Sequence, residues 1–493
     1  MFLRTTRRGF IQGGLAAGAA LALPDRILRA AAASDEINVG LIGCGGRGTE
    51  LLQMFHKIEG VNIAGLCDPD EQRIATLKKE YPNAKTWVDL RGMLDDKDLD
   101  AVVIATCNHW HALAAIWAMQ AGKDVYVEKP LANTHWEGQQ VVAAAKKYGR
   151  ICQVGTQQRS DPMQAEIRAF LHDNHQIGKL ESVRVNRYGI RESIGKRAAP
   201  LETPKMVDYN LWLGPAQDVP IHRNKLHYDW HWMWNTGAGE MGNWGVHVLD
   251  DVRNTVFQDK VKLPTKIAGG GGRLVWNDAG ETPNMHFAYF EAGGIPVVMG
   301  LCNLPSAPGS EKAPERPGPG SGYVAYCEGG RLEGQRGSAA ALDKQGKSIR
   351  KFKGVGGNDL HQQNFINSVR SRDASTLNTT AEVGLYSTGW CHLANIACLV
   401  GGKLTDDRAA AIKSQSPECE GLIDELAEIL AAHKIDPKGG QITLSSVLEF
   451  DPEREKFTGN GAEVANKHLT REFRAPFAVP EVSVEAVQQA QRT

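Results

Sequence analysis

From residue 37 onwards, short apolar runs alternate with segments in which apolar positions recur every three or four residues. The runs 37–44, 61–68, 101–106, 124–130 and 151–156 predict buried strands, and the segments 47–57, 69–80, 110–121 and 134–148 predict helices between them. Runs rich in β-branched residues, separated by amphipathic helices, are typical of a parallel sheet that is covered on both faces. We therefore predict a doubly wound α/β domain over residues 37–158.

The pattern changes after residue 158. A predicted helix over 163–173 precedes a long alternating strand over 180–190, and a loop rich in Trp, His and Pro over 191–239 precedes a helix over 240–257. The β-like runs 265–276, 285–294, 295–303 and 322–330 follow without helices between them, which indicates an antiparallel or mixed sheet. A Pro/Gly-rich loop over 306–322 is expected to be mobile or to fold over a site. We predict an α+β domain over 159–401, with helices at 361–370 and 381–399.

Residues 402–493 form a C-terminal extension in which the pattern predicts one helix, 420–433, and a polar tail. The whole chain of 493 residues is long enough for two or three domains. Its 42% hydrophobic and 23% charged residues match a soluble globular protein, and a net charge of −1 gives no indication of a nucleic-acid or membrane partner. The nine cysteines are scattered, without paired zinc spacing, so we expect no disulfide framework.

The first 33 residues carry features of an export signal. Arg7 and Arg8 precede Phe10, a weakly apolar run over 13–23 follows, and Ala31 to Ala33 offer cleavage sites. This order resembles a twin-arginine signal, which implies a periplasmic or otherwise exported protein that crosses the membrane already folded. The alternative, a lone membrane anchor, is disfavoured because the run is shorter than the roughly 20 apolar residues of a spanning helix. We expect no membrane span in the mature chain.

A glycine-rich stretch follows the first predicted strand. Gly43, Gly45 and Gly48 form G-x-G-x-x-G, with Gly46 and Arg47 between them, at the start of a predicted helix. Such glycines permit a tight turn and a close approach to a pyrophosphate, and the helix N-terminus favours its charge. Asp68 ends the next strand, twenty residues after Gly48, where a carboxylate binds the ribose 2′-hydroxyl. This favours NAD over NADP, the alternative being a glycine turn beside a strand-capping aspartate.

A second motif follows the strand at 124–130. The segment AGKDVYVEKPLA, with Glu128, Lys129 and Pro130, resembles the Gfo/Idh/MocA family of sugar and cyclitol oxidoreductases. The similarity extends upstream through His109 and His111 and reappears in 361–373 and 381–397. It implies a Rossmann domain for the nicotinamide cofactor, an open sheet that covers the substrate, and a homo-oligomer built through that sheet. The implied cofactor contacts, beside the glycine loop, are Thr106, Asn108, His111, Glu128 and Lys129.

The helix predicted over 240–257 carries a candidate base. Asn243, His247 and Asp250 are spaced so that one helix face would present all three. The resemblance implies that His247 accepts the proton of the alcohol, and that Lys129 lies near the reacting hydroxyl. An aspartate often stands in the family where Asn243 stands here. This difference leaves room for Lys129, His231 or Tyr209 to share the proton transfer.

An aromatic cluster precedes that helix. Trp230, Trp232 and Trp234 surround His231, and such a cluster near a cofactor is typical of a carbohydrate pocket. A hydrophobic plug between domains is the alternative. His109 and His111 lack a third ligand by spacing, so we predict no metal.

Together these features predict an exported NAD-dependent oxidoreductase that transfers hydride between a sugar, glycoside or cyclitol hydroxyl and a tightly bound nicotinamide. Because free NAD is not expected outside the cytoplasm, the cofactor would be inserted before export and recycled on the enzyme. Two alternatives stay open: an NAD-dependent glycoside hydrolase that acts by transient oxidation and elimination, and a non-catalytic sugar or dinucleotide sensor.

Overall fold

The computed structural model describes residues 36–173 and 175–483, and the predicted export signal lies outside them. The N-terminal half is a six-stranded sheet in the order β3-β2-β1-β4-β5-β6, in which every neighbouring pair is parallel. This confirms the doubly wound domain. Its strands are β1 Ile37–Ile42, β2 Val61–Cys67, β3 Lys85–Trp87, β4 Ala101–Ile104, β5 Asp124–Val127 and β6 Cys152–Val154.

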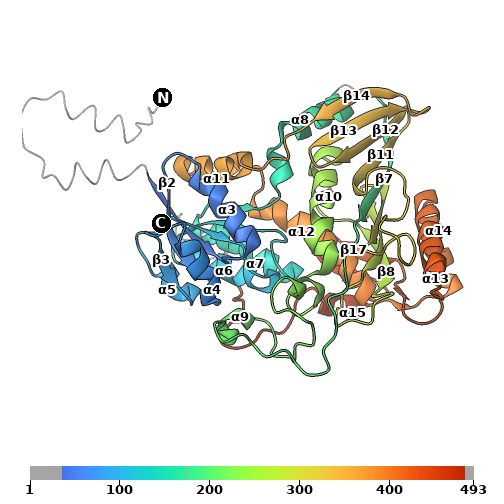
Figure 1. Ribbon diagram of the computed structural model, residues 1–493. Helices are drawn as coiled ribbons and strands as arrows, with labels where there is room; N and C mark the ends of the chain where they lie inside the picture. Colours follow the sequence, from blue (N-terminus) through green and yellow to red (C-terminus); the bar gives the residue numbers. More distant parts are fainter. Residues whose placement is uncertain (1–35, 174, 484–493) are drawn as a thin grey trace, which may run out of the picture.

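Helices cover both faces of this sheet (Figure 1). They are α3 Gly46–His56, α4 Glu71–Lys78, α5 Leu90–Leu94, α6 Asn108–Gln120 and α7 His135–Tyr148. The helix α11, Leu360–Ser371, returns from the second half of the chain and packs Phe365 and Ile366 into the same core as Leu41 and Phe55. The helix predicted from Pro69 instead begins at Glu71, because the side chain of Asp70 caps it by accepting a hydrogen bond from the amide of Gln72.

The second half is built on a large, mostly antiparallel sheet. Its core order is β14-β13-β12-β11-β7-β10-β9-β8, in which β7 and β10 are the parallel pair. These strands are β7 Leu180–Tyr188, β8 Lys266–Gly272, β9 Met285–Ala292, β10 Ile295–Cys302, β11 Ser321–Cys327, β12 Gly330–Gln335, β13 Ser338–Asp343 and β14 Ser348–Lys353. The helices α8 Pro162–Arg168, α9 Tyr209–Leu213, α10 Val246–Asp251 and α12 Ala381–Leu399 complete this half. Figure 1 shows α10 and α12 between the large sheet and the Rossmann domain.

The helix predicted over 420–433 is confirmed as α14 Pro417–Ala432, but the prediction that the rest of the segment after residue 401 is a polar tail is wrong. This segment folds into α13 Asp406–Lys413, α14, α15 Ala462–Lys467 and the short strands β15 Gly402–Lys403, β16 Thr443–Leu444, β17 Leu448–Asp451 and β18 Lys456–Thr458. Strands of two to four residues are too short to show an alternating pattern. Two of them, β16 and β17, pair with β8 and extend the large sheet.

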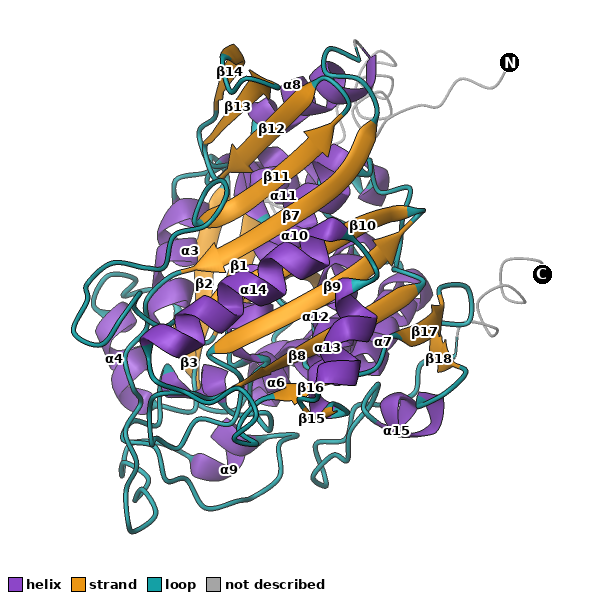
Figure 2. Cartoon of the chain, turned by 90° about the vertical axis from the view of Figure 1, so that its right-hand side faces the viewer, coloured by secondary structure: helices purple, strands orange, loops and turns teal. Residues whose placement is uncertain are grey.

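The helix α14 lies across the outer face of the large sheet (Figure 2). Leu422, Leu426 and Leu430 share a buried cluster with Phe287 and Val298 of that face. The Pro/Gly-rich loop 306–322 folds on this face too, where the carbonyls of Pro317 and Pro319 accept hydrogen bonds from the Asn186 amide. The loop therefore does not cover the cavity between the domains.

All nine cysteines are free, as the scattered spacing predicts. Within residues 36–173 and 175–483, no helix has both the length and the apolar character that a bilayer crossing requires.

Candidate active site between the two domains

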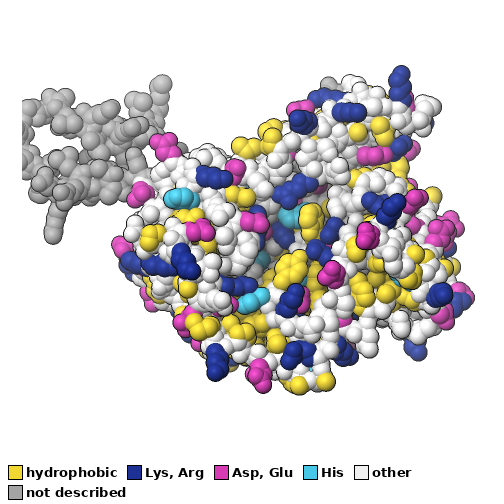
Figure 3. Space-filling view, in the orientation of Figure 1, with side chains coloured by type: hydrophobic (Ala, Val, Ile, Leu, Met, Phe, Trp, Pro, Cys, Tyr) yellow, Lys and Arg dark blue, Asp and Glu magenta, His cyan; other side chains and the backbone are white. Residues whose placement is uncertain are grey.

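A cavity of about 520 Å³ opens between the Rossmann domain and the large sheet. Figure 3 shows this hollow, with basic, histidine and apolar side chains on its walls. One end is lined by the glycine loop and Asp68, and the other by Lys129, Asn243 and His247. The structure therefore brings the predicted cofactor and catalytic residues to one continuous space.

The glycine loop leaves room for a ligand at the N-terminus of α3. Gly43 has φ +98°, and a Cβ there would lie 2.6 Å from the Ala105 carbonyl oxygen. A Cβ at Gly48 would lie 1.9 Å from the Gly43 carbonyl oxygen, so Gly48 serves close packing and does not line the cavity. A Cβ at Gly46 would meet nothing within 4 Å, and no side chain caps the helix. This bare, uncapped turn fits a dinucleotide pyrophosphate.

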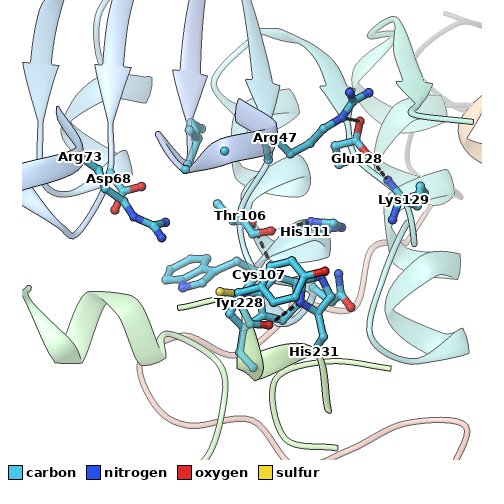
Figure 4. A pocket seen from close by; sticks show the side chains of 18 of the residues that line it. Arg47, Asp68, Arg73, Thr106, Cys107, His111, Glu128, Lys129, Tyr228 and His231 are labelled. Carbon is cyan, nitrogen blue, oxygen red and sulfur yellow. Dashed lines mark hydrogen bonds and ion pairs between the residues drawn. The ribbon is translucent and has the colours of Figure 1, made fainter. Parts of the chain in front are cut away.

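Asp68 lies at the ribose end of the cavity beside Arg73 (Figure 4). Its carboxylate accepts hydrogen bonds from the amides of Cys44 at 2.7 Å and Asp70 at 2.9 Å. Burial raises the pKa of Asp68 to about 6, although Arg73 opposes this shift. The Asp68 carboxylate favours the ribose 2′-hydroxyl of NAD, whereas the Arg73 guanidinium would favour the 2′-phosphate of NADP. The two side chains therefore have opposite effects on the choice between NAD and NADP.

Glu128 and Arg47 form an ion pair on the cavity wall, with Arg47 Nε 2.9 Å from Glu128 Oε1. The same carboxylate oxygen accepts from Gln157 Nε2 at 3.1 Å. Burial by itself would raise the pKa of Glu128, but Arg47 and Lys129 bring it below its usual value. Glu128 is thus a charged anchor for Arg47, which itself lines the cavity.

Thr106, Asn108 and His111 also line the cavity, as the resemblance implies. The ring of His111 is held between two main-chain carbonyls, at 2.6 Å from Pro130 and 3.2 Å from Thr106. Burial lowers the pKa of His111. The neutral ring has one N–H to donate, and its contact with the Pro130 carbonyl holds the segment that follows Lys129 against α6.

His109 is buried, and its ring contacts the carbonyls of Trp212 at 3.1 Å and Thr236 at 3.2 Å. It therefore ties α6 to the loop that carries the aromatic cluster. No group of three His, Cys, Asp or Glu side chains that could hold a metal occurs in the described parts of the chain.

Lys129 crosses the cavity to Asn243. Its Nζ lies 2.8 Å from the main-chain carbonyl oxygen of Asn243 and 3.3 Å from the Oδ1 atom of the same residue. The amide nitrogen of Asn243 in turn donates to Glu240 at 3.2 Å, and Glu240 is buried between Arg187 and Arg191. A carboxylate is therefore present behind Asn243, and its charge partly offsets the lowering of the Lys129 pKa. Burial is the main cause that lowers the pKa of Lys129.

His247 stands on α10 beside Lys129. Its ring meets Trp244 edge-on, with centroids 5.8 Å apart. Burial lowers its pKa well below the usual value, and the nearby Lys129 and Arg336 add to this shift. A neutral imidazole in this position can accept a proton.

The expectation that Asp250 shares this face is wrong. Asp250 accepts hydrogen bonds from Arg159 at 2.8 Å and Ser387 at 2.5 Å and does not line the cavity. The segment is not one regular helix, because π turns at Met241–Gly245 and Val252–Val256 flank α10. His247 and Asp250 both lie within α10, and the hydrogen bonds from Arg159 and Ser387 hold the Asp250 carboxylate away from the cavity.

The aromatic cluster divides into two parts. Trp230 and His231 line the cavity and stack with ring centroids 3.6 Å apart. The ring Nδ1 of His231 lies 2.5 Å from the Tyr228 carbonyl oxygen, and burial lowers the pKa of His231 to about 3. By contrast, Trp232 is buried beside Arg191, and Trp234 donates its main-chain N–H to Glu281.

Three predicted substrate residues are therefore outside the cavity lining: Tyr209, Trp232 and Trp234. Tyr209 stacks on Trp212, with centroids 5.8 Å apart, in a separate apolar cluster. The cavity instead includes Tyr228, Trp244 and Arg336. Tyr228 and Trp244 adjoin the predicted residues in the sequence, whereas Arg336 lies on a distant hairpin that carries no motif.

The fold and the cavity define a two-domain, dinucleotide-binding protein. Residues 37–156 match the family model described as "Oxidoreductase family, NAD-binding Rossmann fold", and residues 192–295 match "Oxidoreductase family, C-terminal alpha/beta domain". The chain belongs to the Gfo/Idh/MocA oxidoreductase family.

Curated relatives match part of the chain. Inositol 2-dehydrogenase 2 of Saccharopolyspora erythraea is 37% identical over 155 residues, which cover 30% of this chain and 45% of the relative. A glycosyl hydrolase family 109 protein of a Shewanella species is 39% identical over 127 residues, covering 24% of this chain and 28% of the relative. Each match spans less than half of the relative's length.

Solved structures share the fold more widely. The WlbA dehydrogenase from Bordetella pertussis, solved with NADH and UDP-GlcNAcA, has a TM-score of 0.54 at 18% identity and covers 72% of this chain and 94% of its own. At this level of identity the likeness concerns the fold alone.

Proposed function

We propose that this protein is an exported, NAD-dependent oxidoreductase that acts on a CH–OH group of a sugar, glycoside or cyclitol. The observation that carries the proposal is the single cavity shared by the bare glycine turn and the Lys129–Asn243–His247 group. The similarity to inositol dehydrogenases supports a polyol substrate. The twin-arginine pattern of residues 1–33 supports export.

The glycine loop, Asp68, Arg47 and the residues around Thr106 would hold the dinucleotide, which supplies a hydride acceptor when bound. Lys129 has three N–H donors, of which two contact Asn243, so the third can hold the oxygen of the reacting hydroxyl. A nitrogen of the neutral His247 ring can accept the proton of that hydroxyl. The flat rings of Trp230 and Tyr228 suit the C–H face of a sugar.

The experiment that tests this proposal measures NADH formation by the purified protein with a panel of hexoses, glycosides and inositols. Oxidation of at least one panel member should depend on both Lys129 and His247. A protein that forms no NADH with any of them, and whose other activities survive the double variant Lys129→Met/His247→Gln, would instead be a sensor.

A hydrolase is the second candidate, favoured by the similarity to glycosyl hydrolase family 109 proteins. In that reaction the ring carbon next to a transient carbonyl would lose its proton to a base of the site, and the glycosidic bond would break by elimination, with the aglycone leaving as an alcohol. Water would then add across the resulting double bond, which returns a hydrogen from solvent to that ring carbon, and the carbonyl would be reduced again. Product formed in heavy water would carry deuterium at that carbon. Cleaved product without deuterium would exclude elimination.

A further inference from the structure

The substrate end of the cavity presents one cation, Arg336, that has no carboxylate partner within the described residues. The carboxylates that line the whole cavity are Glu50, Asp68, Asp89 and Glu128. Arg47 pairs with Glu50 and Glu128, Arg91 pairs with Asp89, and Asp68 lies at the ribose end. The charges of Glu128 and Glu240 also act on Lys129, which leaves Arg336 as the cation beside His247 without a carboxylate partner in the described residues. An unpaired cation in a cleft favours an anionic ligand.

Arg336 extends from the tight turn between β12 and β13, next to Gly337 at φ +73°. Its guanidinium donates one hydrogen bond, to the neutral amide oxygen of Asn358 at 3.3 Å. Within the described residues it has no ion pair, unlike Arg187 and Arg191, which both pair with Glu240. A guanidinium carries five donors in a fork that matches carboxylate and phosphate groups, so most of its donors stay available.

Arg336 lies at the end of the cavity that contains His247, and not at the end that contains Asp68 and would hold the ribose. It lines the cavity with His247 and Trp244 and is close enough to His247 to contribute to the pKa shift of that ring. Asp68 and Arg73, in contrast, occupy the far end of the same space (Figure 4). A group bound by Arg336 would therefore belong to the substrate.

We propose that the substrate carries a carboxylate or phosphate group and that Arg336 binds this group while Lys129 and His247 act on a ring hydroxyl. This inference rests on the proposed function and narrows its substrate class to acidic sugars or cyclitols. Arg336 would therefore determine substrate specificity. It lies on the large sheet, whereas Lys129 lies on the Rossmann domain and His247 lies on α10.

The test uses matched sugars and the full processed protein. Glucuronate, glucose and glucose 6-phosphate form one set, and the galactose and mannose counterparts form two more. Calorimetry gives the binding constant of each, and NADH formation gives kcat and KM. The variants are Arg336→Gln, Arg336→Lys and, as control, Lys344→Gln, which removes an exposed charge from the same sheet outside the cavity.

We expect an anionic sugar to bind at least about tenfold more tightly than its neutral counterpart, as a charged hydrogen-bonding pair would allow. Arg336→Gln should abolish this preference and raise KM with little change in kcat, Arg336→Lys should restore part of it, and Lys344→Gln should change neither. Uronates and phosphates compared within a set distinguish the two anion types. High salt should reduce the preference.

Equal binding of neutral and anionic sugars, no binding of any anionic sugar, or an unchanged preference in Arg336→Gln would overturn the inference. Loss of bound NAD from Arg336→Gln would assign the guanidinium to the cofactor and overturn it as well. Neutral sugars oxidised equally by wild type and variant would leave the proposed oxidoreductase intact. Anionic sugars that bind through Arg336 but are never oxidised would instead contradict the oxidoreductase.

Discussion

At the scale of single residues, burial and charge decide which groups of the cavity carry protons. Burial lowers the pKa of Lys129, Glu128 raises it, and Arg47 lowers it again. His247 is affected in the same direction by burial and by the cations around it. His247 is therefore unprotonated and ready to accept a proton at neutral pH, and Lys129 passes a proton on more readily than it does in water, which suits a pair that relays the proton of an alcohol.

Replacement of Lys129 by Met should lower kcat for alcohol oxidation by about 10²–10⁴-fold, the usual contribution of a positioned proton-transfer group. The content of bound nicotinamide should stay close to that of the wild type, because the glycine loop is untouched. Lys97→Met, at an exposed lysine of the same domain, serves as control. If the Lys129→Met protein had the kcat of the wild type, Lys129 would have no role in the proton transfer.

The pH dependence follows from the neutral state of His247. Oxidation needs the unprotonated ring, and its pKa is lowered, so kcat should stay constant down through the pH range in which an ordinary histidine titrates. Arg336 is one of the causes of the shift, hence Arg336→Gln should move the acidic limb of the kcat profile to higher pH. If the acidic limb of the wild-type kcat profile lay at the pH at which an ordinary histidine titrates, and if Arg336→Gln did not move it, His247 would not be the proton acceptor.

Asp68 should control the choice between NAD and NADP. Its ionised carboxylate repels a 2′-phosphate, so Asp68→Asn should lower the preference for NAD by about tenfold or more. Because the pKa of Asp68 is about 6, the wild-type preference should also weaken as the pH falls through 6. Binding constants for both dinucleotides at several pH values test this, with the exposed Asp98→Asn as control. A preference that is independent of both the substitution and the pH would contradict it.

At the scale of elements, the segment after α15 ties the two domains together. Arg471 donates hydrogen bonds to the carbonyls of Asn235 and His109 and pairs with the fully buried Glu137 at 2.9 Å. Phe477 packs against the ring of Trp110 on α6, with centroids 5.5 Å apart. This segment thereby fixes the loop that carries Trp230 and His231 onto the Rossmann domain.

Arg471→Ala should destabilise the fold by about 3 kcal/mol, because it leaves the Glu137 carboxylate buried without its partner. Denaturant unfolding of the folded protein measures this loss. Lys467→Ala, which removes an exposed pair with Glu463 nearby, should change stability by less than about 0.5 kcal/mol. If the two substitutions lowered the free energy of unfolding equally, the buried Arg471–Glu137 pair would stabilise the fold no more than the exposed Lys467–Glu463 pair does.

The helix α14 bears on the predicted homo-oligomer. It covers the outer side of β9 and β10 with Leu422, Leu426 and Leu430. An oligomer built through this sheet would have to include α14 or use the strands beside it. Homo-oligomerisation remains a prediction.

At the scale of the molecule, the order of strands and helices in the Rossmann domain was predictable because long buried runs and amphipathic helices give clear periods. Motif resemblance to the family predicted Lys129 and His247 as candidate catalytic residues, and both line the same cavity. Three details were beyond the sequence: the hydrogen bonds that hold Asp250 away from the cavity, the exclusion of Tyr209, Trp232 and Trp234 from its lining, and the presence of Arg336 in that lining. Each depends on contacts between residues far apart in the chain, which no local pattern encodes.

We propose that the cavity holds a nicotinamide dinucleotide tightly enough to be carried through export. The most direct test purifies the processed protein, dialyses it exhaustively, denatures it and quantifies the nicotinamide released per chain. We expect nearly one NAD per chain. A protein that contains no bound NAD and works only with added NAD would contradict insertion of the cofactor before export and its recycling on the enzyme. Such a protein would be a dehydrogenase that exchanges its cofactor at every turnover.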